Sequence, residues 1–334
     1  MTDQLHNNLV RFFLRRPEQI SAFLRAVLPA AVQAELNLVV VRDAAENFVD
    51  DNLSSREADI LCTVELHEPH SGGEAVAYVL IEHQSQADPA MAYRLFRYVA
   101  DIWSRHKRDE AGSVVLPPVI PVVLFHGERP WHASRDVCGL VGGSRALVRA
   151  LSPHMPGFSY LLEDLTIESD EDIIRRFGDK KVQLMLLLLR HGRSPEPIGP
   201  KLHEWLNLMR RVRSTPDGRQ YSRAVLEYLY SVRERAEWRN IDEVASLLGP
   251  EERKIAVTIA ETLRAEGRAE GEVRGRAEGE VKGRVATLCK LLKLKFGDVS
   301  EQALERLEHA SPAELDLWTG RILEAKSLEE LFQA

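Results

Sequence analysis

The amino-terminal segment has apolar residues at the spacing of amphipathic helices. Proline interrupts a helix interior, so Pro17 and Pro29 are expected to divide residues 5–30 into two short helices and to end the second. The apolar faces of these helices would consist of Phe12, Phe13, Phe23, Leu24, Val27 and Leu28. We therefore expect two helices before the first strand.

Four segments further along the chain are rich in β-branched and apolar residues, as strands are. The predicted strands are residues 38–42, 58–67, 75–84 and 117–126. Between the second and the third, residues 68–74 contain Pro69 and the pair Gly72 and Gly73, which indicates a hairpin loop. These two strands should therefore be antiparallel neighbours.

Helical patterns follow the hairpin and dominate the second half of the chain. Residues 88–106 are expected to form a helix with Asp88 as its N-cap and Pro89 in its first turn. Residues 173–249 also have a helical pattern. This order of elements predicts an α/β fold, with a mixed sheet flanked by helices and a helical C-terminal region.

The predicted organisation has four parts. They are a core domain at 1–170, a helical extension at 171–250, a glycine-repeat helical spacer at 251–287 and a small helical module at 288–334. The spacer is defined by glycine at every fourth position, at Gly267, Gly271, Gly275, Gly279 and Gly283. Each glycine costs about 1 kcal/mol in a helix relative to alanine. One interpretation is a helix that packs on a partner through its small residues, which implies a homo-oligomer formed through the C-terminal helices, and the other is a flexible charged tether.

The composition is that of an ordinary folded protein, with 44% hydrophobic and 28% charged residues among 334. The formal net charge of −7 is not typical of nucleic-acid-binding proteins, although it is compatible with a local basic groove. The three cysteines lack metal-binding spacing and are expected to be reduced packing residues of a cytoplasmic protein. The longest apolar run, residues 184–189, is far shorter than the roughly 20 residues that cross a bilayer, so no membrane contact is expected.

Acidic and amide side chains end the third predicted strand. Glu82 and Gln84 are two residues apart, so they point to the same side of the strand. Symmetrical pairing across the hairpin would put Asp59 opposite Gln84 and Leu61 opposite Glu82. The two carboxylates would then be diagonal neighbours, with Cβ atoms roughly 7–8 Å apart and room for a divalent cation between them. Asp59 alone could equally be a solvent-facing acid, whereas Glu82 follows an apolar run and needs a partner or a function.

Other catalytic signatures are absent from the sequence. It contains neither a phosphate-binding P-loop nor the nucleophile elbow of serine hydrolases. The histidines His67, His70, His83 and His126 lack metal-ligand spacing, and a structural or solvated role is expected for them. His83 should point away from Glu82 and pack beneath the sheet.

Several segments together resemble the Rpn/YhgA-like recombination-promoting nucleases, a family also described as transposase-like. The similar segments are Phe48-Val49-Asp50-Asp51, Ala58-Asp59-Ile60-Leu61, Tyr78-Val79-Leu80-Ile81-Glu82-His83-Gln84-Ser85, Met91-Ala92-Tyr93-Arg94-Leu95-Phe96-Arg97-Tyr98 and Ile120-Pro121-Val122-Val123-Leu124-Phe125-His126-Gly127. The resemblance covers residues 5 to about 250, and the run of motifs carries it rather than any single one.

The resemblance implies a restriction-endonuclease-like core of the PD-(D/E)XK nuclease superfamily. It implies that Asp59 and Glu82 bind Mg²⁺, for which Mn²⁺ could substitute. Gln84 stands where many members have the lysine that orients the attacking water; glutamine can hydrogen-bond a water but carries no charge. Asn7 stands where the family usually has an aspartate. Asp164 matches a later acid of the family, and we interpret it as a cap or surface residue.

The leading hypothesis is a metal-dependent DNA endonuclease that hydrolyses phosphodiester bonds and is associated with recombination or mobile elements. Arg94 and Arg97, on the helix after Glu82, are candidate phosphate contacts, and a solvated helix face is the alternative. The rival hypothesis is a catalytically weak or inactive DNA-binding or interaction protein that retains the nuclease fold. Asn7 and Gln84 favour this rival.

Overall fold

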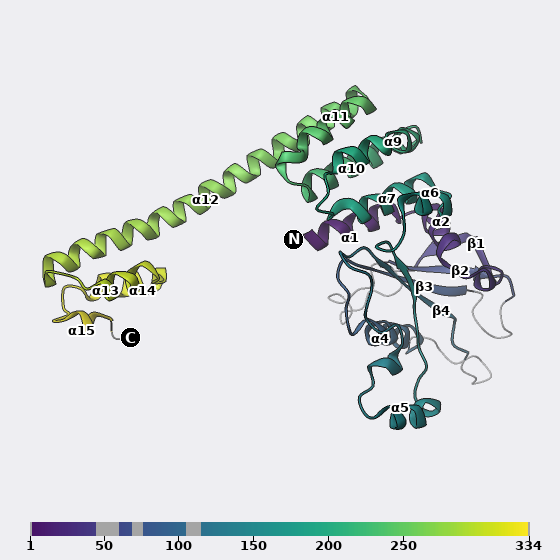
Figure 1. Ribbon diagram of the computed structural model, residues 1–334, viewed down its shortest axis with the longest axis horizontal. Coiled ribbons are helices and arrows are strands. Elements are labelled where there is room, and N and C mark those ends of the chain that lie inside the picture. The colour runs from purple at the N-terminus through teal and green to yellow at the C-terminus, as the bar shows by residue number, and fades with distance from the viewer. Residues whose placement is uncertain (1, 45–59, 69–75, 105–114, 333–334) are drawn as a thin grey trace. The chain divides into compact units, whose positions relative to one another are not determined.

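The computed structural model divides the chain into two compact units, Met1–Ile259 and Ala260–Ala334, each considered by itself (Figure 1). The residues that it describes are 2–44, 60–68, 76–104 and 115–332. Among them, none of the helices combines the length and the apolar character needed to cross a bilayer.

A five-stranded mixed sheet forms the centre of the first unit. Its strands lie in chain order, β1 (Leu36–Asp43), β2 (Ile60–Leu66), β3 (Val76–Gln84), β4 (Val119–Phe125) and β5 (Leu161–Asp164). β1, β2 and β3 pair antiparallel, whereas β3, β4 and β5 pair parallel. The α/β fold with a mixed sheet and a helical C-terminal region is therefore confirmed. β5 was not among the predicted strands.

The pairing within the hairpin differs from the sequence-based expectation. Leu61 pairs with Leu80, and not with Glu82 as symmetry of the loop predicted. The observed register differs from the predicted one by two residues, and side chains alternate between the faces of a strand with a period of two. Each side chain of the described ladder therefore keeps its predicted face although its partner changes. The ladder ends at the pair Ile60 and Ile81, and Asp59 lies outside the described residues.

Helices cover both faces of the sheet (Figure 1). α4 (Met91–Ser104) lies on one face, where Met91 and Leu95 pack against buried Leu80 and Val123 in one apolar cluster. On the other face lie α1 (Thr2–Phe13), α2 (Pro17–Val27) and α7 (Lys180–Gly192). The two amino-terminal helices separated at Pro17 are thus confirmed.

Further helices complete the first unit. They are α3 (Ala30–Gln33), η2 (Val137–Leu140), α5 (Arg145–Leu151), η3 (Ser152–His154), α6 (Asp170–Arg176), α8 (Ile198–Glu204), α9 (Leu206–Arg213), α10 (Gly218–Val232), η4 (Arg235–Glu237) and α11 (Trp238–Leu248). The helical pattern predicted for residues 173–249 is confirmed. The segment that contains α5 leaves the sheet after β4 and returns to it at β5.

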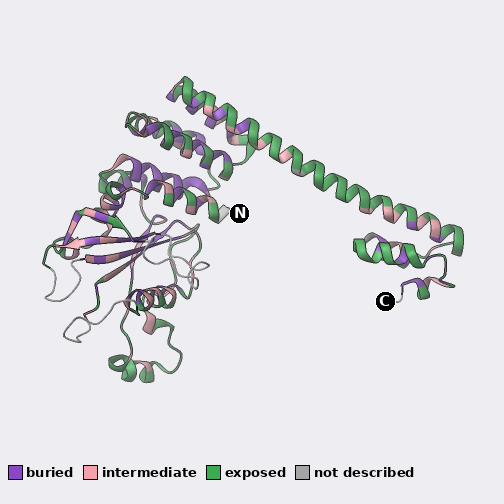
Figure 2. Ribbon diagram, turned by 180° about the vertical axis from the view of Figure 1, so that it is seen from behind, coloured by how far each residue is buried: buried purple, intermediate pink, exposed green. Residues whose placement is uncertain are grey.

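The 47-residue helix α12 (Pro250–Phe296) contains the glycine repeat. Most side chains in the middle of this helix are exposed (Figure 2). A Cβ atom added at Gly271, Gly275, Gly279 or Gly283 would meet no atom within 4 Å. The repeat is therefore helical, and its glycines do not serve close packing against another described part of the chain.

A separate apolar core holds the C-terminal helices together. The second unit contains α13 (Glu301–Glu308), α14 (Pro312–Arg321) and α15 (Leu328–Phe332). Leu288 and Leu292 of α12 pack with buried Leu307, Leu315 and Trp318. This end of the chain is therefore a small helical module.

Candidate functional site

The candidate site lies where β3 ends, on the face of the sheet that α4 covers. Glu82 is only 3% exposed. Gln84 Nε2 donates a hydrogen bond to Glu82 Oε2 over 3.4 Å. The structure thus places Glu82 and Gln84 side by side, because alternate residues of a strand share a face.

An arginine from α4 meets the same carboxylate. Arg94 Nη2 donates to Glu82 Oε2 over 2.8 Å, and its Nη1 donates to Asp88 Oδ2 over 3.0 Å. Asp88 also accepts a hydrogen bond from the backbone N–H of Ala90 over 2.8 Å, which holds the start of the helix as its predicted capping role implies. The guanidinium therefore joins two carboxylates, one of them buried, and compensates the charge of Glu82.

The donor atoms of this cluster are of the kind that Mg²⁺ binds. Glu82 and Asp88 offer carboxylate oxygens and Gln84 an amide oxygen, which are hard ligands. Within the described parts of the chain, no group of at least three histidine, cysteine or acidic side chains is arranged to hold a metal ion. The donor types fit a hard cation, and a full set requires a ligand such as Asp59, which those parts do not include.

The remaining predicted residues occupy different surroundings. Arg97 is exposed on α4. Asn7 lies on α1, and its Oδ1 is buried without a hydrogen-bond partner among the described residues. Neither position is tied to Glu82 by a described hydrogen bond. Their assignment to a catalytic site stays a prediction.

Asp164 holds the turn that follows β5. Its carboxylate accepts hydrogen bonds from the backbone N–H of Trp131 over 2.9 Å and from the backbone and hydroxyl of Thr166 over 2.9 and 2.7 Å. Strand pairing aligns Gln84 with Phe125 and Phe125 with Asp164, so Asp164 is two strands away from Gln84, roughly 10 Å by strand spacing. Its capping interpretation fits these contacts, but at 8% exposed it is not a surface acid.

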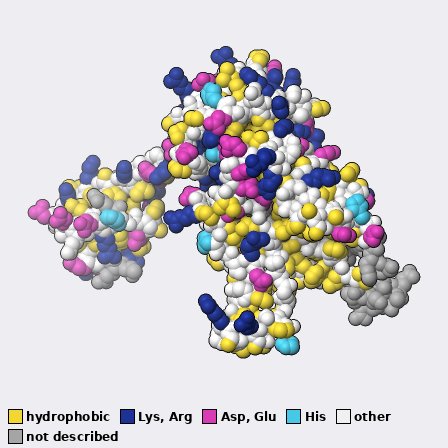
Figure 3. Space-filling view, turned by 45° about the vertical axis from the view of Figure 1, so that its right-hand side comes forward, with side chains coloured by type: hydrophobic (Ala, Val, Ile, Leu, Met, Phe, Trp, Pro, Cys, Tyr) yellow, Lys and Arg dark blue, Asp and Glu magenta, His cyan; other side chains and the backbone are white. Residues whose placement is uncertain are grey.

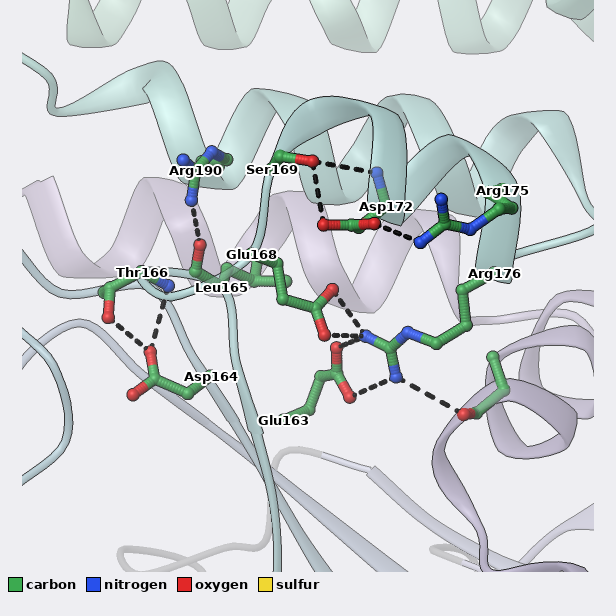
Figure 4. Close-up of polar contacts among 11 residues, drawn as sticks. Glu163, Asp164, Leu165, Thr166, Glu168, Ser169, Asp172, Arg175, Arg176 and Arg190 are labelled. Atoms are coloured by element: carbon green, nitrogen blue, oxygen red, sulfur yellow. Dashed lines mark hydrogen bonds and ion pairs between the residues drawn. The ribbon is translucent and has the colours of Figure 1, made fainter.

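A second buried glutamate lies on β5 (Figure 4). Glu163 is 4% exposed and receives a hydrogen bond over 2.9 Å from Arg176 Nη1, which belongs to a guanidinium that also pairs with Glu168. Burial raises the pKa of Glu163, and Arg176 acts in the opposite direction. The contacts of Arg176 with α2, β5 and the turn after it indicate a structural ion pair.

Three buried histidines, His6, His83 and His126, form a cluster on the opposite face of β3. The rings of His83 and His126 stack with centroids 4.5 Å apart, and His6 lies 4.7 Å from His126. Burial first, and then the charges of His83, His6 and Arg193, lower the pKa of His126 well below its ordinary value. His126 is therefore held neutral, and the expectation that His83 packs beneath the sheet is confirmed. Tyr228 closes the cluster through a 2.8 Å hydrogen bond to His6 Nδ1.

The ion pairs that connect Glu82, Arg94 and Asp88 were not predicted from the sequence. Asp88 was predicted as a cap, and Arg94 as a phosphate contact or a residue of a solvated helix face. The spacing gives no such signal, because Asp88 precedes α4, which begins at Met91, and residues six apart do not share a face of a helix. The contact with Glu82 requires the position of α4 on the sheet.

Comparison with known proteins identifies the family. Residues 4–220 match the family described as "Putative transposase, YhgA-like". The inactive recombination-promoting nuclease-like protein RpnE of Escherichia coli (strain K12) is 29% identical to this chain, with 81% of the chain and 85% of the relative covered. The recombination-promoting nuclease RpnA of the same strain is 28% identical, with 78% and 84% covered. The recombination-promoting nuclease RpnD of Escherichia coli O157:H7 is 29% identical, with 78% and 95% covered.

No solved structure matches the chain. The family match covers well over half of the sequence, and the relatives align along most of their own lengths. The chain belongs to the YhgA-like transposase family.

Proposed function

We propose that the protein is a metal-dependent DNA endonuclease that acts in recombination and hydrolyses phosphodiester bonds at the end of β3. The observation that carries this proposal is the buried carboxylate of Glu82, in hydrogen-bond contact with Gln84 and Arg94. Relatives named as recombination-promoting nucleases support the choice of reaction.

Glu82 and Asp59 would hold Mg²⁺ or Mn²⁺ in this proposal. Asp59 directly precedes Ile60 in the chain, and the partner of Ile60, Ile81, directly precedes Glu82. Such an ion, when bound, polarises the phosphodiester and makes a bound water more acidic. Asp88 offers a further carboxylate through its contact with Arg94.

Gln84 and Arg94 would together take the two roles, water orientation and positive charge, of the lysine found in many related nucleases. The amide of Gln84 can orient a water by hydrogen bonding but cannot supply positive charge. The guanidinium of Arg94, 2.8 Å from Glu82, supplies a cation at the same place. Arg94 is 34% exposed, so it can exchange its carboxylate partners for a phosphate, which arginine binds through paired hydrogen bonds.

Nicking of supercoiled plasmid by the full-length protein tests the proposal. We expect cleavage with Mg²⁺ or Mn²⁺, none with EDTA, and a loss of about 100-fold or more for Glu82→Gln and Asp59→Ala, since each removes a ligand. Glu163→Gln is the matched control, because it also neutralises a buried glutamate that is paired with an arginine. Nicking by Glu82→Gln at the wild-type rate would refute the assignment.

A second candidate function is DNA binding without cleavage. Arg94 pairs with the carboxylate that the metal would need, and the relative RpnE is named inactive. If wild-type protein binds DNA but does not nick it with either ion, this function replaces the first.

Self-association through the C-terminal helices is a further proposal. The open glycine positions along α12 leave an edge where another helix can approach closely. Light scattering of the full chain over a range of concentrations tests it, and a monomeric mass at every concentration would remove it.

A further inference from the structure

The segment between β4 and β5 carries an exposed projection, which we call the α5 arm (residues 137–159). It contains η2, α5 and η3, and α5 lies at the end of the arm that is far from the sheet (Figure 1). None of the seven residues of α5 is buried. Helices shorter than roughly 12–15 residues are marginal by themselves. A helix this short and this exposed therefore gains stability from any partner that it contacts.

Two unpaired arginines give the arm its charge. Arg145 and Arg149 are exposed and one helical turn apart, and neither side chain forms an ion pair or a hydrogen bond with a described residue. The sequence from Val137 to Leu162 contains no acidic residue. In the space-filling view, the tip of the arm shows basic and apolar side chains and no acidic ones (Figure 3). The arm is therefore complementary to a polyanion although the whole chain is acidic.

Apolar side chains lie on the other side of α5 from these arginines. Leu147 is 51% exposed and Leu151 is 41% exposed, and they are also one helical turn apart. Residues two apart on a helix point in nearly opposite directions, so these leucines do not share a face with Arg145 and Arg149.

The base of the arm is attached next to the candidate site. Phe158 packs edge-on against Phe96 of α4, with ring centroids 5.7 Å apart. Tyr160, directly after the arm, has its pKa raised to about 12 by burial, and the charge of Asp88 contributes to this shift. Asp88 in turn pairs with Arg94. A duplex bound at Glu82 therefore has the arm beside it.

We propose that the α5 arm contacts duplex DNA, with Arg145 and Arg149 on backbone phosphates. The inference rests on the proposed function only in its choice of DNA as the partner. A second copy of the chain fits less well. In a two-fold interface the same patch faces itself, which would bring together four arginines with no acid from the arm between them.

The test is binding of a fluorescently labelled DNA duplex by the full-length protein in EDTA, measured by anisotropy at several salt concentrations. The variant is Arg145→Ala with Arg149→Ala. We expect at least about tenfold weaker binding and a salt slope smaller by about 2, because two phosphate contacts are lost. The matched control replaces Arg219 and Arg223, which have the same spacing on the exposed side of α10, and should leave binding within about twofold.

A second variant, Leu147→Gln with Leu151→Gln, separates DNA from protein contacts. Because these leucines lie on the other side of the helix, we expect DNA binding to stay within about twofold and the mass from light scattering to be unchanged. Unchanged DNA binding by the arginine variant would overturn the inference. A lower mass for the leucine variant, together with intact DNA binding by the arginine variant, would assign the arm to self-association instead. Because EDTA prevents metal-dependent cleavage, an arm-dependent affinity supports the inference even if the plasmid assay shows no nicking.

Discussion

Two consecutive residues of β3, Glu82 and His83, belong to polar clusters on opposite faces of the same sheet. Glu82 meets Gln84 and Arg94 beneath α4, and His83 stacks on His126 on the other face. Both side chains are buried, at 3% and 7% exposed. The two clusters nevertheless differ in charge and in contact with solvent.

The difference shows two ways of burying polar groups. The carboxylate of Glu82 is compensated by a cation whose side chain is still 34% exposed. On the histidine side, burial keeps His126 neutral, so no counter-ion is needed. A partner that reaches solvent, such as Arg94, can be exchanged for a ligand. A change in the buried histidine cluster can only disturb its packing. We therefore expect the reaction to take place on the face of the sheet that α4 covers, and we expect the histidines on the opposite face to serve packing.

Removing one partner of the ion pair should produce the largest change in stability. Arg94→Ala leaves the carboxylate of Glu82 in a buried place without its cation, and we expect a loss of about 1–3 kcal/mol in the free energy of unfolding. Glu82→Gln leaves a half-buried arginine that still pairs with Asp88. This variant should therefore lower the free energy of unfolding by less than about 1 kcal/mol. Urea unfolding in EDTA measures both.

Arg97→Ala provides the control, because Arg97 is an exposed residue of the same helix and its loss should change stability by less than about 0.5 kcal/mol. If Arg94→Ala and Glu82→Gln were equally destabilising, burial would not distinguish the two partners. The proposed exchange of Arg94 between carboxylate and phosphate would then lose its physical basis.

Acidification should lower the stability of the fold mainly through the histidine cluster. The pKa of His126 is lowered in the folded protein, by burial first and then by the charges of His83, His6 and Arg193. The unfolded chain therefore binds a proton more readily, so stability is full above the ordinary histidine pKa of about 6.5 and is lost as pH falls below it. One such group contributes at most about 1.4 kcal/mol per pH unit.

Urea unfolding between pH 7.5 and 5.5, a range of about one unit on either side of the ordinary histidine pKa, should show this loss. Histidine NMR gives the direct measurement, and we expect the ring of His126 to stay neutral at a pH well below the ordinary histidine pKa. A midpoint for His126 at or above the ordinary value would contradict the lowered pKa.

The strands of the sheet could be predicted because they are continuous apolar runs. β5 could not, since it has only four residues and includes Glu163 and Asp164. Its acids are accommodated by Arg176 and by backbone donors from the loop after β4, which are contacts between distant parts of the chain. α5 was also missed, because its seven residues are too few to show a clear helical period.

The candidate site shows the same limit. The two-residue period of a strand was enough to place Glu82 and Gln84 on one side. The same period could not establish the register, because Leu61 keeps its face whether it pairs with Leu80 or with Glu82. The ion pair of Arg94 with Glu82 depends on how α4 packs on the sheet. The sequence around a residue was therefore enough to predict the face of the sheet to which its side chain points. It was not enough to predict the residues that the side chain contacts.

A smaller effect than that of Arg94→Ala is expected from Tyr228→Phe, which removes a single hydroxyl beside the histidine cluster. This hydroxyl is 2.8 Å from His6 Nδ1 and donates to the carbonyl of Leu188 over 3.3 Å. Its loss should cost about 1 kcal/mol in urea unfolding, the usual value for one buried hydrogen bond. Tyr93→Phe, at a residue that is 53% exposed, should change nothing measurable.

Plasmid nicking by the same variant completes the comparison of the two faces. Tyr228 and the histidines lie on the face of β3 opposite Glu82, so Tyr228→Phe should nick at the wild-type rate under conditions in which it remains folded. A folded Tyr228→Phe that has lost its nicking activity would show that the two clusters act together. The histidine side would then position the end of β3 for the reaction instead of only packing beneath it.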